Sequence, residues 1–281
     1  MFQTSIPGTC DFYKKNIVKS LALIFTLGFT LSAAGQKNMQ DIIQRSMQAN
    51  DEDWQAAPEY SYLKLERHEG ETRTYEVKMI LGSPYQRLVA VNGNPLSPAE
   101  QAKEQRSAEE VSAQRLGESQ AEREKRIAKY EKDRSHDHLL MDEMAKAFDF
   151  KLVGVRNSGG SDVYVLKVTP NPNYQPPNIE TKVLTAMQGE LWIDKKTFKW
   201  VKVEAEVVRP VLIAGFLACV EKGTRFELEK MPINDSISLP KHFSMKSKAR
   251  IFFFFTNQKE VDETYFDYQK AVPTETAGIR N

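Results

Sequence analysis

A chain of 281 residues, of which 41% are hydrophobic and 27% are charged, has the composition of an ordinary globular protein. This length is sufficient for one large core, so we do not expect disorder throughout. The 39 basic and 38 acidic residues nearly cancel and give a formal net charge of +1. Such a balance gives no reason to expect nucleic acid as a partner.

The first 34 residues have the pattern of a secretory signal. Three lysines precede an apolar run over residues 21–31, and the small residues 32–34 follow it. An uncleaved membrane anchor is the alternative, but an apolar run of about 11 residues is much shorter than the roughly 20 that span a bilayer. We therefore predict a signal peptide over residues 1–34, cleavage after Ala34 and a periplasmic location.

Cleavage changes both the charge and the cysteine content. It removes three lysines and Asp11, which leaves 36 basic and 37 acidic residues. It also removes Cys10, so Cys219 remains alone and no internal disulfide can form. Because Cys10 precedes the apolar run, it cannot become a lipid-bearing first residue, and we expect a soluble mature protein held together by its core.

The first part of the mature chain predicts one helix and three strands. Apolar residues recur at helical spacing over residues 38–50, and Asn38 is the predicted N-cap. After Pro58 the apolar and polar residues alternate, with glycine-containing turns between the alternating runs. The predicted strands cover residues 60–67, 73–81 and 85–91.

Residues 97–147 form the most unusual segment. Ser97 can cap a helix, Pro98 suits its first position and Glu100 can complete a capping box. The predicted helix, with a break at Gly117, is rich in charged residues and has too few large apolar residues to be buried. We predict a solvated arm or hairpin that projects from the sheet and docks only through Leu139, Leu140, Met144 and Phe148.

Strands resume after this segment. The apolar stretch Pro210–Val220 is interpreted as a buried strand or connector, and the alternatives are a mobile flap over the cleft or a patch that touches the membrane. Residues 271–281 are interpreted as a flexible tail. A short helical segment is predicted over residues 179–187. The predicted strands cover residues 148–155, 162–169, 189–194, 201–208, 224–230, 241–255 and 260–268.

The clearest strand pattern carries a family resemblance. Residues 189–208 read GELWIDKKTFKWVKVEAEVV, with apolar residues at alternate positions. Together with GTRFELEK from Gly223 and KARIFFFF from Lys248, this stretch resembles bacterial outer-membrane lipoprotein-sorting proteins, relatives of the periplasmic carriers LolA and LolB. The resemblance covers roughly the last half of the chain. It implies a single α+β domain over residues 35–270, in which helices cover a curved antiparallel half-barrel sheet of about 10–11 strands.

Alternate apolar residues on successive strands predict one concave apolar face. This face either keeps a cleft for an apolar ligand or fills with its own side chains, and the pattern alone supports both interpretations. Four successive rings at residues 252–255 favour apolar groups on both sides of the sheet. The predicted cleft lining consists of Tyr75, Val77, Met79, Leu191, Ile193, Val201, Val203, Phe226, Leu228, Ile251 and Phe253.

The resemblance implies a carrier that holds the acyl chains of lipoproteins, or other lipids, during outer-membrane lipoprotein sorting. It implies no cofactor, and it implies a membrane-bound donor or acceptor protein and transient membrane contact. The charged segment 97–147 departs from the compact carriers. A first alternative is therefore a sensor-type module that detects unassembled lipoproteins or envelope stress, and a second is a hydrolase of apolar substrates.

Catalytic and metal motifs do not stand out in the sequence. There is no G-x-S-x-G, no H-E-x-x-H and no phosphate-binding glycine loop. His136 and His138 flank Asp137, but residues two apart on a helix point in different directions, so both cannot bind one ion. His138 and Asp142 can share a face, yet two ligands are too few for a tight site. We predict neither a metal site nor an enzyme.

Overall fold

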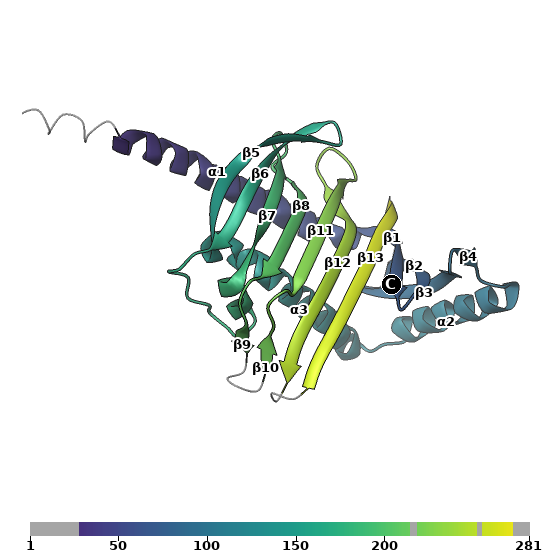
Figure 1. The fold of residues 1–281 in the computed structure, drawn as a ribbon. Coiled ribbons are helices and arrows are strands. Elements are labelled where there is room, and N and C mark those ends of the chain that lie inside the picture. The colour runs from purple at the N-terminus through teal and green to yellow at the C-terminus, as the bar shows by residue number, and fades with distance from the viewer. Residues whose placement is uncertain (1–27, 214–217, 252–254, 272–281) are drawn as a thin grey trace, which may run out of the picture. The chain divides into compact units, whose positions relative to one another are not determined.

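The computed structural model describes residues 28–213, 218–251 and 255–271. Two compact units divide the chain after Ile42, and each is described by itself. The first unit holds the beginning of α1 (Gly28–Ala56), and the second holds the rest of α1 and every later element (Figure 1). Within the described residues, no helix is both long and apolar enough to cross a membrane.

The second unit is built on one sheet of 13 strands in which neighbouring strands run antiparallel. Its main path is β4-β3-β2-β1-β13-β12-β11-β8-β7-β6-β5. The strands are β1 (Tyr60–His68), β2 (Glu71–Ile80), β3 (Ser83–Val91), β4 (Asn94–Pro95), β5 (Phe148–Ser158), β6 (Ser161–Pro170), β7 (Met187–Asp194), β8 (Trp200–Val207), β11 (Arg225–Pro232), β12 (Ser238–Ile251) and β13 (Phe255–Lys270).

The sheet is open and curved, as Figure 1 shows, and helices lie against one side of it. The predicted α+β class with a curved antiparallel sheet is therefore confirmed. The sheet has more strands than predicted because β4 and the pair β9 (Val211–Ile213) and β10 (Ala218–Val220) are too short to show a clear alternating pattern. The stretch Pro210–Val220 thus contains two strands, and β10 pairs with both β9 and β12.

Cross-strand pairing identifies the two faces of the sheet. Leu191 on β7 lies opposite Leu166 on β6 and Val203 on β8, and all three are buried. The same row continues to Leu228 on β11 and Phe243 on β12. We call this side the inner face. The helices α1, after Ile42, and α3 (Gln120–Ala147) lie behind the sheet on this side in Figure 1.

The charged segment forms two capped helices. α2 (Pro98–Leu116) begins with the predicted capping box, in which Ser97 and Glu100 bond to each other's backbone N–H groups. α3 begins with a second box made by Ser119 and Glu122. The predicted break lies near Gly117, but the two helices do not fold back on each other as a hairpin: they follow one another from β4 at one edge of the sheet to β5 at the other (Figure 1).

The prediction that only the end of this segment docks is wrong. Arg115 donates to the carbonyls of Ile80 and Ser83, both at 2.8 Å, and Arg126 donates to the Ser83 hydroxyl at 2.7 Å. These arginines hold the turn between β2 and β3, where Ile127 also packs against Gly82. α3 therefore docks at both ends, and α2 docks at its C-terminal end through Arg115 although none of its residues is fully buried. Counting apolar residues missed this because the docking groups are mostly guanidinium groups.

Other predictions near the N-terminus have mixed outcomes. α1 begins at Gly28 and runs through Asn38, so Asn38 is not an N-cap. The predicted signal falls mostly on residues 1–27, which lie outside the described residues, and its cleavage point lies within α1. The predicted helical segment over 179–187 is the 3₁₀ helix η2 (Thr181–Ala186). Another 3₁₀ helix, η1 (Ala57–Glu59), joins α1 to β1.

Gly189 on β7 provides a direct test of the register between β7 and β8. A methyl group at this position would lie 1.8 Å from the carbonyl oxygen of Glu204. We predict that Gly189→Ala lowers the free energy of unfolding by about 3 kcal/mol or more, because backbone must move to admit the methyl group. Gly154→Ala on β5 is the matched control, since no atom lies within 4 Å of its added methyl. Equal urea midpoints for the two variants would contradict the register.

Candidate functional site

The predicted cleft lining is largely gathered on the inner face. Cross-strand pairing from β2 through β1, β13, β12, β11 and β8 to β7 shows that the predicted lining residues of β2, β7 and β11, and Val203 of β8, share this face. Of these residues, Val77, Leu191, Ile193 and Val203 are buried, and Tyr75, Met79, Phe226 and Leu228 are half-buried.

Three predicted lining residues have a different outcome. The register of β7 with β8 shifts between Trp192 and Ile193, which puts Trp200 rather than Val201 opposite Ile193. Trp200 is only 2% exposed and fills the inner face where Val201 was expected. A bulge of this kind depends on the partner strand, so alternation within one strand does not reveal it. Phe253 and the side chain of Ile251 lie outside what the structure describes.

Like Tyr75 and Met79, a group of five other apolar side chains on the inner face is half-buried. They occupy two neighbouring cross-strand rows on β11, β12 and β13, next to the fully buried residues of β7 and β8. We call them the apolar strip: Phe226, Leu228, Phe243, Met245 and Val261. The last three were not predicted as lining, although Phe243 and Met245 follow the same alternation.

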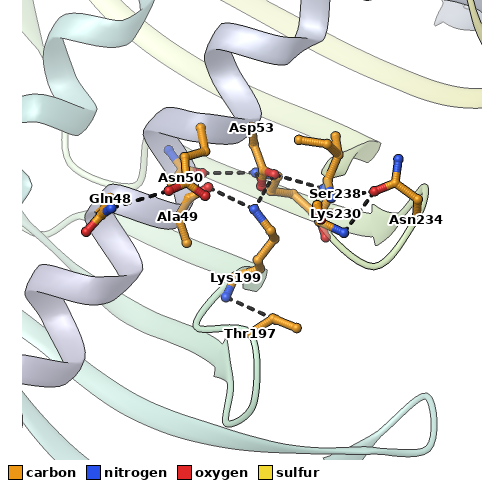
Figure 2. A network of polar contacts seen from close by, with 12 residues as sticks. Gln48, Ala49, Asn50, Asp53, Thr197, Lys199, Lys230, Asn234 and Ser238 are labelled. Carbon is orange, nitrogen blue, oxygen red and sulfur yellow. Dashed lines mark hydrogen bonds and ion pairs between the residues drawn. The ribbon is translucent and has the colours of Figure 1, made fainter.

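A buried charge cluster joins α1 to the sheet beside this strip (Figure 2). The carboxylate of Asp53 accepts hydrogen bonds from Lys199 Nζ at 2.7 Å, Lys230 Nζ at 2.6 Å and the backbone N–H of Ser238 at 2.9 Å. Lys230 also donates to Asn50, and Lys199 donates to the Ala49 carbonyl. The side chains of Asp53, Lys199 and Lys230 are 2%, 7% and 6% exposed.

Two ammonium groups and one carboxylate leave this cluster with an excess of buried positive charge. Burial lowers the pKa of Lys230, and the positive charge of Lys199 acts in the same direction, while Asp53 opposes both. Removing water from a charged group is costly unless opposite charge and hydrogen bonds compensate for it. Asp53 is therefore the group on which both lysines depend.

Tyrosines form a second polar cluster on the inner face. The ring centroid of Tyr62 on β1 lies 5.8 Å from that of Tyr265 and 5.2 Å from that of Tyr268, both on β13. Tyr265 donates to Glu263, and Lys64 Nζ lies 3.8 Å from the same carboxylate. Burial raises the pKa of Tyr62 to about 12, and burial also raises the pKa values of Tyr265 and Tyr268.

An open groove of about 920 Å³ crosses the sheet from β5 to β13, and it is lined mainly by outer-face residues together with Phe226, Met245 and Val261 of the apolar strip. Glu190, Glu204 and Glu227 lie directly opposite one another along one wall. Lys202 Nζ lies 2.6 Å from Glu204 and 2.7 Å from Glu227. Burial opposes the charged form of Lys202, but its hydrogen bonds to these two carboxylates raise its pKa. The charged side chains of this wall are thus neutralised by one another, as is usual on a sheet face in contact with water.

His138, one of the two histidines predicted not to bind a metal together, contacts α1 from α3. His138 Nε2 lies 3.1 Å from Asp142, the residue predicted to share its face, and 3.5 Å from Asp51 of α1. Its ring stacks on Trp54, with centroids 4.3 Å apart. Within the described residues, no group of three His, Cys, Asp or Glu side chains is placed to hold a metal ion.

Comparisons with known proteins give weak similarities. No family model matches the chain, and no curated protein matches it. The chain is similar to a structure described as an outer membrane lipoprotein-sorting protein domain from Vibrio parahaemolyticus, with 9% identity and a TM-score of 0.30. That match covers 83% of this chain and 94% of the other.

Structures of MucB and MucA are also similar. The Pseudomonas aeruginosa MucA/MucB complex matches at 13% identity and a TM-score of 0.23, covering 78% of this chain and 93% of that one. The structure of MucB with the periplasmic part of MucA matches at 12% identity and a TM-score of 0.18. That match covers 77% of this chain and 93% of the other. The family that the sequence resembles is thus represented among the similar structures. These TM-scores are low, and nothing about function is inferred from them.

Asp53→Asn tests the buried charge cluster. The change leaves two buried ammonium groups without a carboxylate, and we predict a loss of about 3–5 kcal/mol in the free energy of unfolding. Adding Lys230→Met should recover part of that loss, because one uncompensated charge is then removed. Glu52→Gln, at an exposed neighbouring position, is the control and should change stability by less than about 0.5 kcal/mol. If Asp53→Asn and Glu52→Gln changed the free energy of unfolding in urea equally, the Asp53 carboxylate would not be what stabilises the two buried lysines.

The buried tyrosines predict a loss of stability at high pH. Above pH 10 the unfolded chain releases phenol protons that the native tyrosines retain, so the free energy of unfolding falls as pH rises from 10 through about 12. Tyr62→Phe should weaken this dependence, while the other tyrosines keep the remainder. The measurement is phenolate absorbance alongside circular dichroism. Ionisation of all ten tyrosines near pH 10 without unfolding would contradict the prediction.

Proposed function

We propose that this protein binds the acyl chains of lipoproteins, or other lipids, on the inner face of its sheet and carries them in the periplasm. The apolar strip is the observation that supports this most. Its five side chains keep partial contact with water, whereas Leu191 and Val203 on the neighbouring strands are buried. An acyl chain laid along the strip would complete that burial.

The energy available from such burial is sufficient for useful affinity. Each buried methylene contributes up to about 0.8 kcal/mol, so a chain of about 15 methylenes offers on the order of 12 kcal/mol before ordering costs. No cofactor is required for this kind of binding. Apolar contacts of this kind distinguish lipids mainly by chain length.

Access to the strip involves α3. Residues 120–136, the first half of this helix, have no fully buried side chain, and the buried residues His138, Met144 and Ala147 follow in the second half. The first half is held by Arg126 and Ile127 at the turn between β2 and β3, and by Arg134, which donates to the carbonyl of Trp54 and lies 3.9 Å from the centroid of its ring. We infer that this half lifts to admit a ligand, since lifting it exposes little apolar surface.

Substitution within the strip tests lipid binding. Phe243→Lys puts an ammonium group among the strip residues, and we predict that it weakens binding of a fluorescently labelled palmitate by about tenfold or more. Ser244→Lys is the matched control, because Ser244 is the next residue in β12 and faces the outer side. Fluorescence titration measures both, with circular dichroism to verify folding. Equal loss, or no loss, in the two variants would contradict binding on the inner face.

A transfer assay distinguishes the carrier from its alternatives. A carrier moves a diacylated lipopeptide from donor vesicles to acceptor vesicles, whereas a sensor binds it without net transfer. The exposed, charged surface of α2 favours the sensor as second candidate, since it is open to a protein partner. A hydrolase would release free fatty acid in the same assay. The inner face carries the polar side chains of Lys64, Glu263 and Lys230, which a hydrolase could use. Release of fatty acid in the assay therefore tests the hydrolase alternative.

A further inference from the structure

The two edges of the sheet are protected to different degrees. β4 consists of two residues and ends in Pro95, whereas β5 has 11 residues and no proline. In the described part of the chain, β5 pairs with β6 only. A long edge strand presents unpaired backbone N–H and C=O groups that another strand can bind. β5 is therefore the edge at which this sheet can be extended.

The middle of β5 is also unusually apolar for an exposed edge. Leu152, Val153 and Val155 are 43%, 55% and 48% exposed. Charges, proline and bulges keep edge strands free, and β5 has two of these features, the exposed Lys151 and the bulge at Val153. Its exposed apolar residues nevertheless favour a covered edge, with Asp149 and Arg156 on either side of them.

A bulge in β5 determines which residues share a face. Leu152 lies opposite Leu166 of β6, but Gly154 lies opposite Val165, so Val153 is an extra residue. The extra residue reverses the alternation of faces along the strand. Asp149 and Arg156, which lie opposite Thr169 and Val163, therefore share one face. By the same pairing, Phe150 and Val155 lie opposite Val168 and Tyr164 and share the other face.

We propose that β5 pairs with β5 of a second copy of this chain, antiparallel across a two-fold axis between Leu152 and Val153. Asp149 then lies opposite Arg156 of the second copy, and Phe150 lies opposite its Val155. Leu152 and Val153 of the two copies meet at the centre. Every pair occurs twice by symmetry, the pairs on either side of the bulged Val153 have matching faces, and the charged pairs have opposite sign.

The neighbouring register is less favourable. Moving the axis to the next position with matching faces puts Lys151 opposite Arg156 of the second copy, and two such like-charged pairs oppose association. Of these two registers, the one centred between Leu152 and Val153 has complementary charges; moving the axis the other way pairs Asp149 with Gly154 and loses the attraction to Arg156. This pairing is independent of the proposed lipid binding, because it uses the sheet edge and not the apolar strip.

Charge exchange on β5 tests the pairing through the mass of the purified protein, measured by sedimentation equilibrium at micromolar concentrations. The unchanged protein should be a dimer. Asp149→Arg gives two arginine pairs across the axis and Arg156→Asp gives two aspartate pairs, and each variant alone should dimerise about tenfold more weakly. An equal mixture of the two variants restores opposite charges at both positions and should restore the dimer.

Two controls make the result specific. Lys103→Asp, at an exposed position on α2, should leave the dimer unchanged. Circular dichroism of each variant verifies folding, and recovery in the mixture rules out misfolding as the cause of weak dimerisation. A monomeric unchanged protein, or a dimer insensitive to both exchanges, would overturn the proposal. Recovery in the double variant Asp149→Arg/Arg156→Asp would support it further.

Discussion

One buried carboxylate determines how the second half of α1 lies on the sheet. Asp53 is bonded to Lys199, Lys230 and the N–H of Ser238, which belong to the turn after β7, to β11 and to the start of β12. A buried ion of this kind is stable only when all its partners are present, so other positions of the helix are strongly disfavoured. With α1 fixed in this way, the apolar strip beside the charge cluster remains half-buried.

Local patterns predicted the elements that depend on local physics. Side-chain alternation is a property of a single strand, and it located every long strand and most of the inner face, including Phe226 and Leu228. The capping box at Ser97 was predicted for the same reason, and the same signal at Ser119 and Glu122 could have located the start of α3.

Features that depend on distant partners were not predicted. Lys199 and Lys230 are ordinary surface residues by type, and they are buried because Asp53, 146 and 177 positions away, compensates them. The bulges at Val153 and next to Trp200 are properties of strand pairs. A sequence pattern therefore predicts which residues share a strand face more reliably than which residues at that face remain open to a ligand.

The helices α2 and α3 connect β4 to β5, which are opposite edges of the sheet. From Ile127, which packs at the turn of β2 and β3, to the end of α3 at Ala147 the helix spans about 30 Å. The path along the sheet from β3 to β5 crosses nine strand spacings and measures roughly 43 Å. A rigid rod shorter than the surface it bridges keeps that surface bent. If α3 detached at Ile127, the two edges of the sheet could move apart. The curvature of the sheet therefore depends on whether α3 is docked at the turn between β2 and β3.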